Sequence, residues 1–95
     1  MPTLHVKILS LRASERYALR RIVLVAEREV RPQVPGLVLS IEEIDDPSRI
    51  GRYSAALVQP SLVIEEKAVC CGRVPGREEV TAWLREAAGI GVPRS

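Results

Sequence analysis

Residues 55–80 decide the fold, and they read Ala-Ala-Leu-Val-Gln-Pro-Ser-Leu-Val-Ile-Glu-Glu-Lys-Ala-Val-Cys-Cys-Gly-Arg-Val-Pro-Gly-Arg-Glu-Glu-Val. Two short runs rich in β-branched residues, 61–64 and 68–74, flank the charged turn 65–67. This spacing predicts an antiparallel hairpin. Pro60 has no N–H to donate to a strand ladder, so it fits only before or at the first residue of a strand. An amphipathic run begins just after the second strand, so the hairpin leads directly into a helix.

The sequence before the hairpin predicts two more strands and two more helices. Residues 4–11 are rich in Leu, Val and Ile, which favours a strand covered on both faces. Ser14 is expected to cap the helix that follows. The apolar residues of that helix recur every three or four positions, at Leu19, Ile22, Val23, Ala26 and Val30. Residues 37–44 alternate as a second strand, and Asp46 is placed to cap a short helix that begins at Pro47.

The last helix has the clearest pattern. Gly76 is its expected N-cap, and two glutamates in its first turn suit the positive end of the helix dipole. Gly89 supplies a left-handed C-terminal stop. One apolar face is expected to bury Trp83 against the sheet; it comprises Val80, Trp83, Leu84, Ala87 and Ala88.

The predicted order is therefore βαβαββα, an α/β fold with a mixed four-stranded sheet flanked by three helices. A right-handed crossover makes the first two strands parallel neighbours. The helices are expected to cover both faces of the sheet. Residues 1–95 form one domain, whose core spans about residues 4–89.

Composition limits the classes of function. Hydrophobic residues make up 46% and charged residues 27%, but aromatic residues only 3%, so the core must be aliphatic. Few rings are present for bases to stack on, and a net charge of +2 is not typical of a DNA-binding protein, so no nucleic-acid partner is expected. The longest apolar run, residues 22–26, is too short to cross a bilayer. With no signal-peptide pattern at the start, the chain is expected to be a soluble cytoplasmic protein without a membrane partner.

The quoted stretch resembles the thioredoxin fold, specifically the small redox-active disulfide proteins of bacteria and archaea. The resemblance covers about residues 4–89. It is carried by Val58-Gln59-Pro60-Ser61-Leu62-Val63-Ile64, by Val69-Cys70-Cys71-Gly72-Arg73-Val74-Pro75, and by the Glu-Glu-Val that starts the last helix. It implies a cis bond between Gln59 and Pro60, beside the active-site loop, and Gly72 on the next strand.

The chain departs from that family at the active site. The family places a Cys-x-x-Cys at the start of the first long helix, whereas this chain has Arg12-Ala13-Ser14-Glu15-Arg16-Tyr17 there. Ala13 and Arg16 stand where the two thiols would fall. Dithiol exchange requires an activated thiolate and a second, resolving thiol, and neither is present at this position. The sequence therefore predicts no dithiol oxidoreductase site.

The two cysteines present, Cys70 and Cys71, are adjacent on a predicted strand in mid-sheet. Neighbouring strand residues point to opposite faces, so these two are poorly placed to pair with each other. In mid-sheet they are expected to be small buried hydrophobes. The cysteines and the single histidine, His5, make no recognisable zinc site, and the acidic residues 42–46 lack the spacing of a calcium loop. No metal or cofactor is expected.

Three functions stay open. The leading hypothesis is a non-redox module that binds a protein or peptide in extended conformation, with Gln59 beside Pro60 offering backbone for pairing. In it, Ser14, Glu15 and Arg16 form the opposite wall. The first alternative is an enzyme-class function, a monothiol redox protein that uses Cys70 or Cys71. The second is a small-anion site at the N-terminus of the first helix, helped by Arg12 and Arg16.

Overall fold

The elements of this chain follow the predicted order. The structure, a computed structural model, describes residues 3–52 and 60–89. In these two ranges it is an α/β fold with one four-stranded mixed sheet and three α-helices, as expected. The elements are β1 (Thr3–Leu9), α1 (Ala13–Val30), a 3₁₀ turn η1 (Arg31–Gln33), β2 (Val38–Ile44), α2 (Pro47–Ile50), β3 (Ser61–Ile64), β4 (Lys67–Cys71) and α3 (Arg77–Ala87).

The strands lie in the order β2-β1-β3-β4. β1 and β2 are parallel, with Leu4 beside Leu39, so the predicted crossover through α1 is confirmed. β3 runs antiparallel to β1 and places Ser61 beside Leu9. β4 pairs antiparallel with β3, which leaves β2 and β4 as the outer strands of the described sheet.

The hairpin turn is tighter than predicted, and β4 is shorter. The loop consists of Glu65 and Glu66 alone, both with positive φ, at 51° and 66°. A two-residue turn of this hand usually contains Asn or Gly, because other side chains are strained there. β1 holds the turn in place: the His5 N–H donates to Glu65 Oε2 at 2.6 Å, and Lys7 Nζ pairs with Glu66 Oε2 at 2.6 Å. β4 ends at Cys71 because Gly72, with φ of 85°, turns the chain away.

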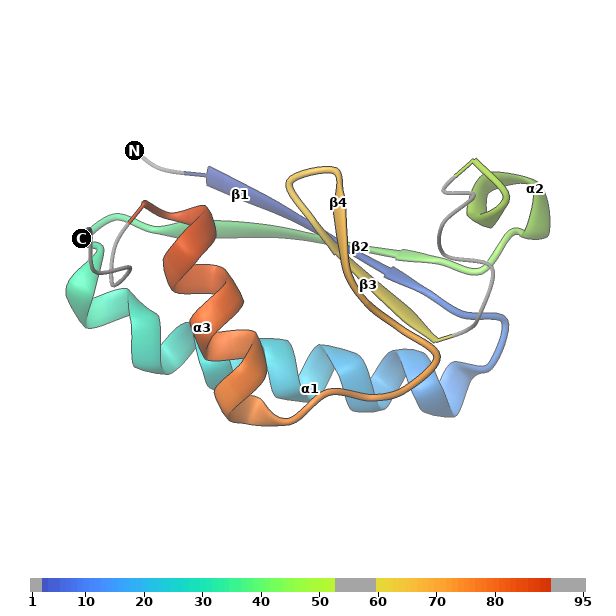
Figure 1. Cartoon of the computed structure of the whole chain (residues 1–95), viewed down its shortest axis with the longest axis horizontal. Coiled ribbons are helices and arrows are strands. Elements are labelled where there is room, and N and C mark those ends of the chain that lie inside the picture. Colours follow the sequence, from blue (N-terminus) through green and yellow to red (C-terminus); the bar gives the residue numbers. More distant parts are fainter. Residues whose placement is uncertain (1–2, 53–59, 90–95) are drawn as a thin grey trace.

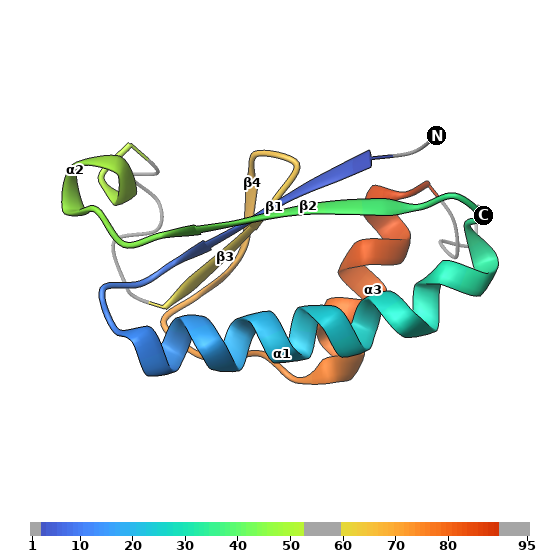
Figure 2. The same ribbon diagram turned by 180° about the vertical axis from the view of Figure 1, so that it is seen from behind.

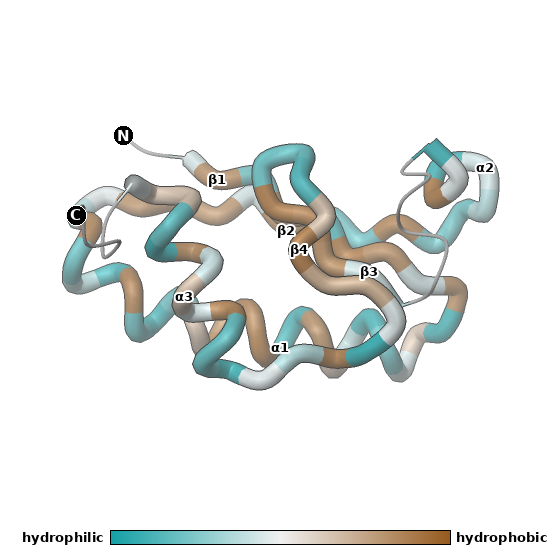
Figure 3. The backbone as a smooth tube through the Cα atoms, viewed as in Figure 1, coloured by the Kyte–Doolittle hydropathy of each residue, from teal (hydrophilic) through white to brown (hydrophobic). Residues whose placement is uncertain are grey.

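α1 and α3 cover one face of the sheet, and α2 lies at one end of the other face (Figures 1 and 2). Hydrophobic residues, brown in Figure 3, recur along the strands and along α1 and α3, and the main core lies between this sheet face and the two helices. Its core is aliphatic as predicted and includes Val6, Ile8, Leu19, Val23, Ala26, Val30, Leu62, Val80 and Leu84. The predicted stripe of α1 is confirmed, since four of its five residues are buried and Ile22 is half-buried.

The second face is covered much less than predicted. α2 is a single turn, and Ile50 is its buried residue. Ile50 packs in a separate small cluster with Leu9, Ile44 and Val63. Among the described residues, helices therefore lie on both faces, but only one face carries a full helical layer.

Two of three predicted helix caps are confirmed. Asp46 caps α2 by accepting a hydrogen bond from Ser48 N–H at 2.9 Å, and Gly76 is the N-cap of α3. The prediction for Ser14 is wrong. Helix α1 begins two residues earlier than a Ser14 cap implies, at Ala13, with Arg12 as the N-cap residue, and Ser14 is exposed inside the first turn.

Candidate functional site

Three segments meet where β1 ends and β3 begins: residues 10–16, Pro60 and residues 72–74, together called the three-loop end below. The pairing of Leu9 with Ser61 places Ser10 across from Pro60. The Gly72 N–H donates to the Pro60 carbonyl at 2.8 Å, which brings the third segment beside the second. Figure 1 shows the chain between β4 and α3 passing the starts of β3 and α1. The structure thus brings Pro60 next to the predicted site at the start of α1. Gln59, and with it the predicted cis bond, lies outside the described residues.

A buried serine builds the first turn of α1. Ser10 is fully buried, and its hydroxyl donates to Glu15 Oε1 at 2.6 Å. Ser10 Oγ in turn accepts the Arg12 N–H at 3.0 Å. These hydrogen bonds connect the end of β1 to the start of α1, which has no side-chain cap. No sequence pattern indicated this role, because Ser10 falls in the apolar run that predicts the first strand.

Arg16 is surrounded by acceptors and does not point toward a vacant anion site. Its Nη1 donates to the Ser10 carbonyl at 3.0 Å, and its Nε lies 3.4 Å from Glu43 Oε1. Asp45 Oδ2 is 4.0 Å from its Nη2. The positive charge of Arg16 is therefore matched by Glu43, near the end of β2, and by Asp45, which follows that strand. Of the two arginines in the small-anion hypothesis, only Arg12 is exposed.

The cysteines lie on opposite faces of β4, as predicted for neighbouring strand residues. Cys70 is only 6% exposed, under the helices, and its Sγ is 3.5 Å from the Arg73 carbonyl. Burial raises the pKa of the Cys70 thiol, which disfavours the reactive thiolate. The prediction that Cys71 is buried is wrong: it is exposed, because β4 is an outer strand and α2 does not extend over it.

Two exposed apolar side chains distinguish the three-loop end. Leu11 is 51% exposed and Val74 is 38% exposed, and both lie in loops. Sequence reasoning missed them because each stands at the end of a run that predicts a strand, residues 4–11 and 68–74, whereas β1 ends at Leu9 and β4 ends at Cys71. A protein surface that exposes neighbouring apolar side chains can contact an apolar partner.

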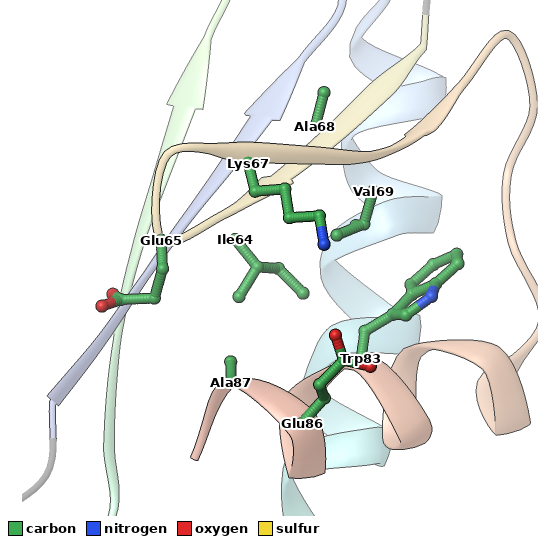
Figure 4. A pocket seen from close by; sticks show the side chains of 8 residues that line it. All are labelled: Ile64, Glu65, Lys67, Ala68, Val69, Trp83, Glu86 and Ala87. Atoms are coloured by element: carbon green, nitrogen blue, oxygen red, sulfur yellow. The ribbon is translucent and has the colours of Figure 1, made fainter. Parts of the chain in front are cut away.

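A cavity of about 400 Å³ lies between the β3–β4 hairpin and α3 (Figure 4). Trp83 forms one wall, and the side chains of Lys67 and Glu86 extend beside it. Trp83 is half-buried, so the expectation that the sheet covers it substantially is only partly met. Ile64 and Val69 of the hairpin line the cavity on the side opposite the helix. It sits at the turn end of the hairpin, away from the three-loop end.

Within residues 3–52 and 60–89, no group of three or more His, Cys, Asp or Glu side chains could hold a metal ion. None of the helices in those ranges is both long and apolar enough to span a membrane. No protein-family model matches the chain, and the curated proteins include no significant match to it.

Proposed function

We propose that the chain is a thioredoxin-like domain without a dithiol, which binds an extended segment of another protein at the three-loop end. The observation that carries the proposal is the meeting of three loops around Pro60, with Leu11 and Val74 exposed among them. The resemblance in sequence implies a binding surface at this place in the fold.

The topology supports the relation to thioredoxin-like proteins. The chain has the implied element order, parallel first strands and an antiparallel hairpin that Pro60 precedes. Gly72 follows β4, one residue later than the resemblance implies, and bonds to the Pro60 carbonyl. Ala13 is the first residue of α1, where a helix N-terminus would activate a thiol if one were present. Alanine has no group that can ionise, so the site can bind but cannot perform dithiol exchange.

The backbone around Pro60 favours a partner in extended conformation. Pro60 has no N–H, and its carbonyl already accepts a hydrogen bond from Gly72. The backbone hydrogen bonds to an added strand would therefore come from Gln59, as the resemblance implies. Leu11 and Val74 would then contact apolar side chains of the bound segment, which gives the interaction selectivity for sequence.

A displayed library of random peptides, selected on the full chain, tests this proposal. Enriched peptides should be apolar at alternate positions, the pattern of a segment that pairs as a strand. Leu11→Glu and Val74→Glu should each weaken their binding at least tenfold. Val38→Glu is the matched control, since Val38 is 44% exposed but lies at the far end of the sheet. Selection of no peptide, or equal loss of binding in all three variants, would overturn the proposal.

One observation favours a second candidate, a monothiol function that uses Cys71. Cys71 is exposed and directly precedes Gly72, so it lies beside the three-loop end. Its thiolate would attack a disulfide such as glutathione disulfide, form a mixed disulfide and release one glutathione thiolate. The burial of Cys70 limits this candidate to Cys71 alone.

Mass spectrometry after incubation with glutathione disulfide distinguishes the two candidates. The monothiol function requires one glutathione adduct on Cys71, formed faster than on an unstructured peptide thiol and lost in Cys71→Ser. Added thiol must also remove this adduct as rapidly as the adduct forms. An adduct no faster than the peptide control would remove this candidate and leave the peptide-binding proposal standing.

A further inference from the structure

The arginines of α1 fall into two groups. Arg16 and Arg20 both pair with Glu43, and Arg31 pairs with Glu27 at 2.6 Å. Arg21 and Arg28 have no carboxylate within ion-pair distance among residues 3–52 and 60–89. The guanidinium of Arg21 instead lies 6.0 Å from the centre of the Tyr17 ring. Arg21 and Arg28 are therefore the arginines of α1 whose charge is not balanced by a carboxylate of the described residues.

These two arginines share the outer face of α1 with exposed apolar residues. Tyr17 is 63% exposed, and Leu24 and Val25 are each 39% exposed. With Arg21 and Arg28 they recur at helical spacing, so they form one stripe that faces away from the sheet. The outer stripe is defined here as Tyr17, Arg21, Leu24, Val25 and Arg28. It contains no acidic residue, because the three glutamates of α1 lie elsewhere on the helix.

A shallow groove borders the outer stripe where α1 meets the start of α3. Ala18, Ile22 and Val25 provide apolar side chains, and Arg21 and Arg77 stand at its margins. Its volume is about 300 Å³, enough to receive a large apolar side chain. Arg77 is already paired with Glu29, at 3.2 Å, which leaves Arg21 and Arg28 as the cations that a partner would meet.

We infer that the outer stripe and this groove are a docking surface for an acidic amphipathic helix of another protein. Arg21 and Arg28 are seven residues apart, so they lie about two helical turns, or roughly 10 Å, from each other on one face. A partner helix with carboxylates at the same seven-residue spacing meets both arginines. An apolar residue between those carboxylates enters the groove over Ile22 and Val25. This surface is separate from the three-loop end and does not depend on the function proposed there.

Charge decides between this partner and a second copy of the chain. Two outer stripes packed face to face would bring the arginines of both copies together, and such like-charge contact is unfavourable. An acidic helix matches the same two cations. The groove also favours a discrete side chain over a flat lipid surface.

The test is a displayed library of helical peptides of about 18 residues, selected on the full chain. Apolar positions follow a heptad pattern, and the flanking positions carry Glu, Lys or Gln at equal frequency. Selected peptides should be enriched in Glu over Lys, and added salt should weaken their binding. Arg21→Glu and Val25→Ser should each reduce affinity at least tenfold, whereas Arg52→Glu, an exposed site beyond α2, should change it less than twofold. A peptide with Lys in place of the contacting Glu should bind Arg21→Glu better than it binds the wild type.

Circular dichroism melting verifies that the variants fold, so a loss of binding reports the surface itself. Enrichment without an acidic bias, or unchanged binding to Arg21→Glu, would overturn the inference. Selection of no helical peptide would do the same. Cosedimentation with phosphatidylserine vesicles that depends on Arg21, with no peptide selected, would replace the acidic helix with an anionic lipid surface.

Discussion

The two faces of the sheet are stabilised in different ways. Beneath α1 and α3 lies a continuous aliphatic cluster that draws on three strands and both long helices. On the opposite face, Ile50 of the one-turn helix α2 packs on three buried apolar residues of the strands at one end. Ion pairs connect the rest of that face to its surroundings: Lys7 binds Glu66 in the hairpin turn, and Glu42 binds Arg49 on α2.

The difference indicates how stability is distributed in a small domain. Apolar burial contributes about 25 cal/mol per Å² and does not depend on salt, whereas an exposed ion pair contributes at most about 1 kcal/mol and is screened. The helix-covered face should therefore account for most of the free energy of unfolding. The other face should mainly position α2 and the hairpin turn.

The largest expected effect comes from replacing one buried residue on each face and comparing the free energies of unfolding. Leu19→Ala should lower the free energy of unfolding by about 2–5 kcal/mol, because Leu19 is fully buried in the larger cluster and its loss leaves a cavity. Ile50→Ala should cost only about 1–2 kcal/mol, because a single helical turn can relax into the vacated space. Urea denaturation of both variants provides the measurement. Equal costs would show that the two faces contribute alike.

A smaller effect is expected for Trp83 at the margin of the helix-covered face. A fully buried Trp→Ala change costs about 3–5 kcal/mol, but Trp83 is only half-buried and lines the cavity, so Trp83→Ala should cost about 1–3 kcal/mol. The native fluorescence should be quenched by acrylamide to an extent between that of a buried and a free indole. Complete protection from acrylamide would mean that the cavity is closed in solution.

Acid should weaken the start of α3 through Glu79. Arg73 holds both carboxylate oxygens, at 2.8 and 2.7 Å, and the Gly76 N–H adds a third hydrogen bond at 3.0 Å. These contacts lower the pKa of Glu79 from its ordinary 4.5 to about 2. The stabilisation is therefore complete above pH 4.5 and is lost as pH falls from there toward 2.

Thermal melts between pH 6 and pH 2 measure this contribution. The melting temperature of the wild type should fall more steeply below about pH 4.5 than that of Glu79→Gln, which cannot titrate there. Glu78→Gln, in the same helical turn, is the matched control and should follow the wild type. On the opposite face the pKa of Glu42 is also lowered, by Arg49, so Glu42→Gln should flatten the same region of the curve. Identical slopes for the wild type and Glu79→Gln would contradict the assigned role of Arg73.

The sequence predicted the fold well where a signal was local. The apolar stripe of α1, the Asp46 cap, the Gly76 N-cap and the positive φ of Gly89 each follow from residues within one or two turns of each other. The first two strands are less local, but chain handedness constrains their pairing.

The candidate site was predictable only in outline, since its contacts join distant residues. The position of Pro60 beside α1 followed from a resemblance, whereas the capture of Arg16 by Glu43 and Asp45 depends on how α1 lies against β2. The exposure of Cys71 depends on which strand is outermost and on how little α2 covers. Alternation along a strand gives the face that a residue occupies, but it does not say what covers that face.

The two faces also differ in how their helices begin, and this gives the smallest predicted effect. α2 has a complete side-chain cap from Asp46, but α3 begins at Gly76, where only the Glu79 carboxylate closes the first turn. Gly76→Ser should add the missing half, with the serine oxygen accepting the Glu79 N–H. The backbone of Gly76 is extended, with φ of −80° and ψ of 161°, and an added Cβ would meet Glu79 Oε1 at an unstrained 3.8 Å.

Gly76→Ser should therefore stabilise the protein by a few tenths of a kcal/mol, roughly 0.5 at most, measured by urea denaturation at neutral pH. Gly76→Ala is the control, because it also restricts the unfolded chain but supplies no oxygen. Serine should exceed alanine, since only serine completes the reciprocal pair of hydrogen bonds. If alanine stabilised as much as serine, the gain would come from the unfolded state, and the Glu79 side chain alone would suffice to start α3.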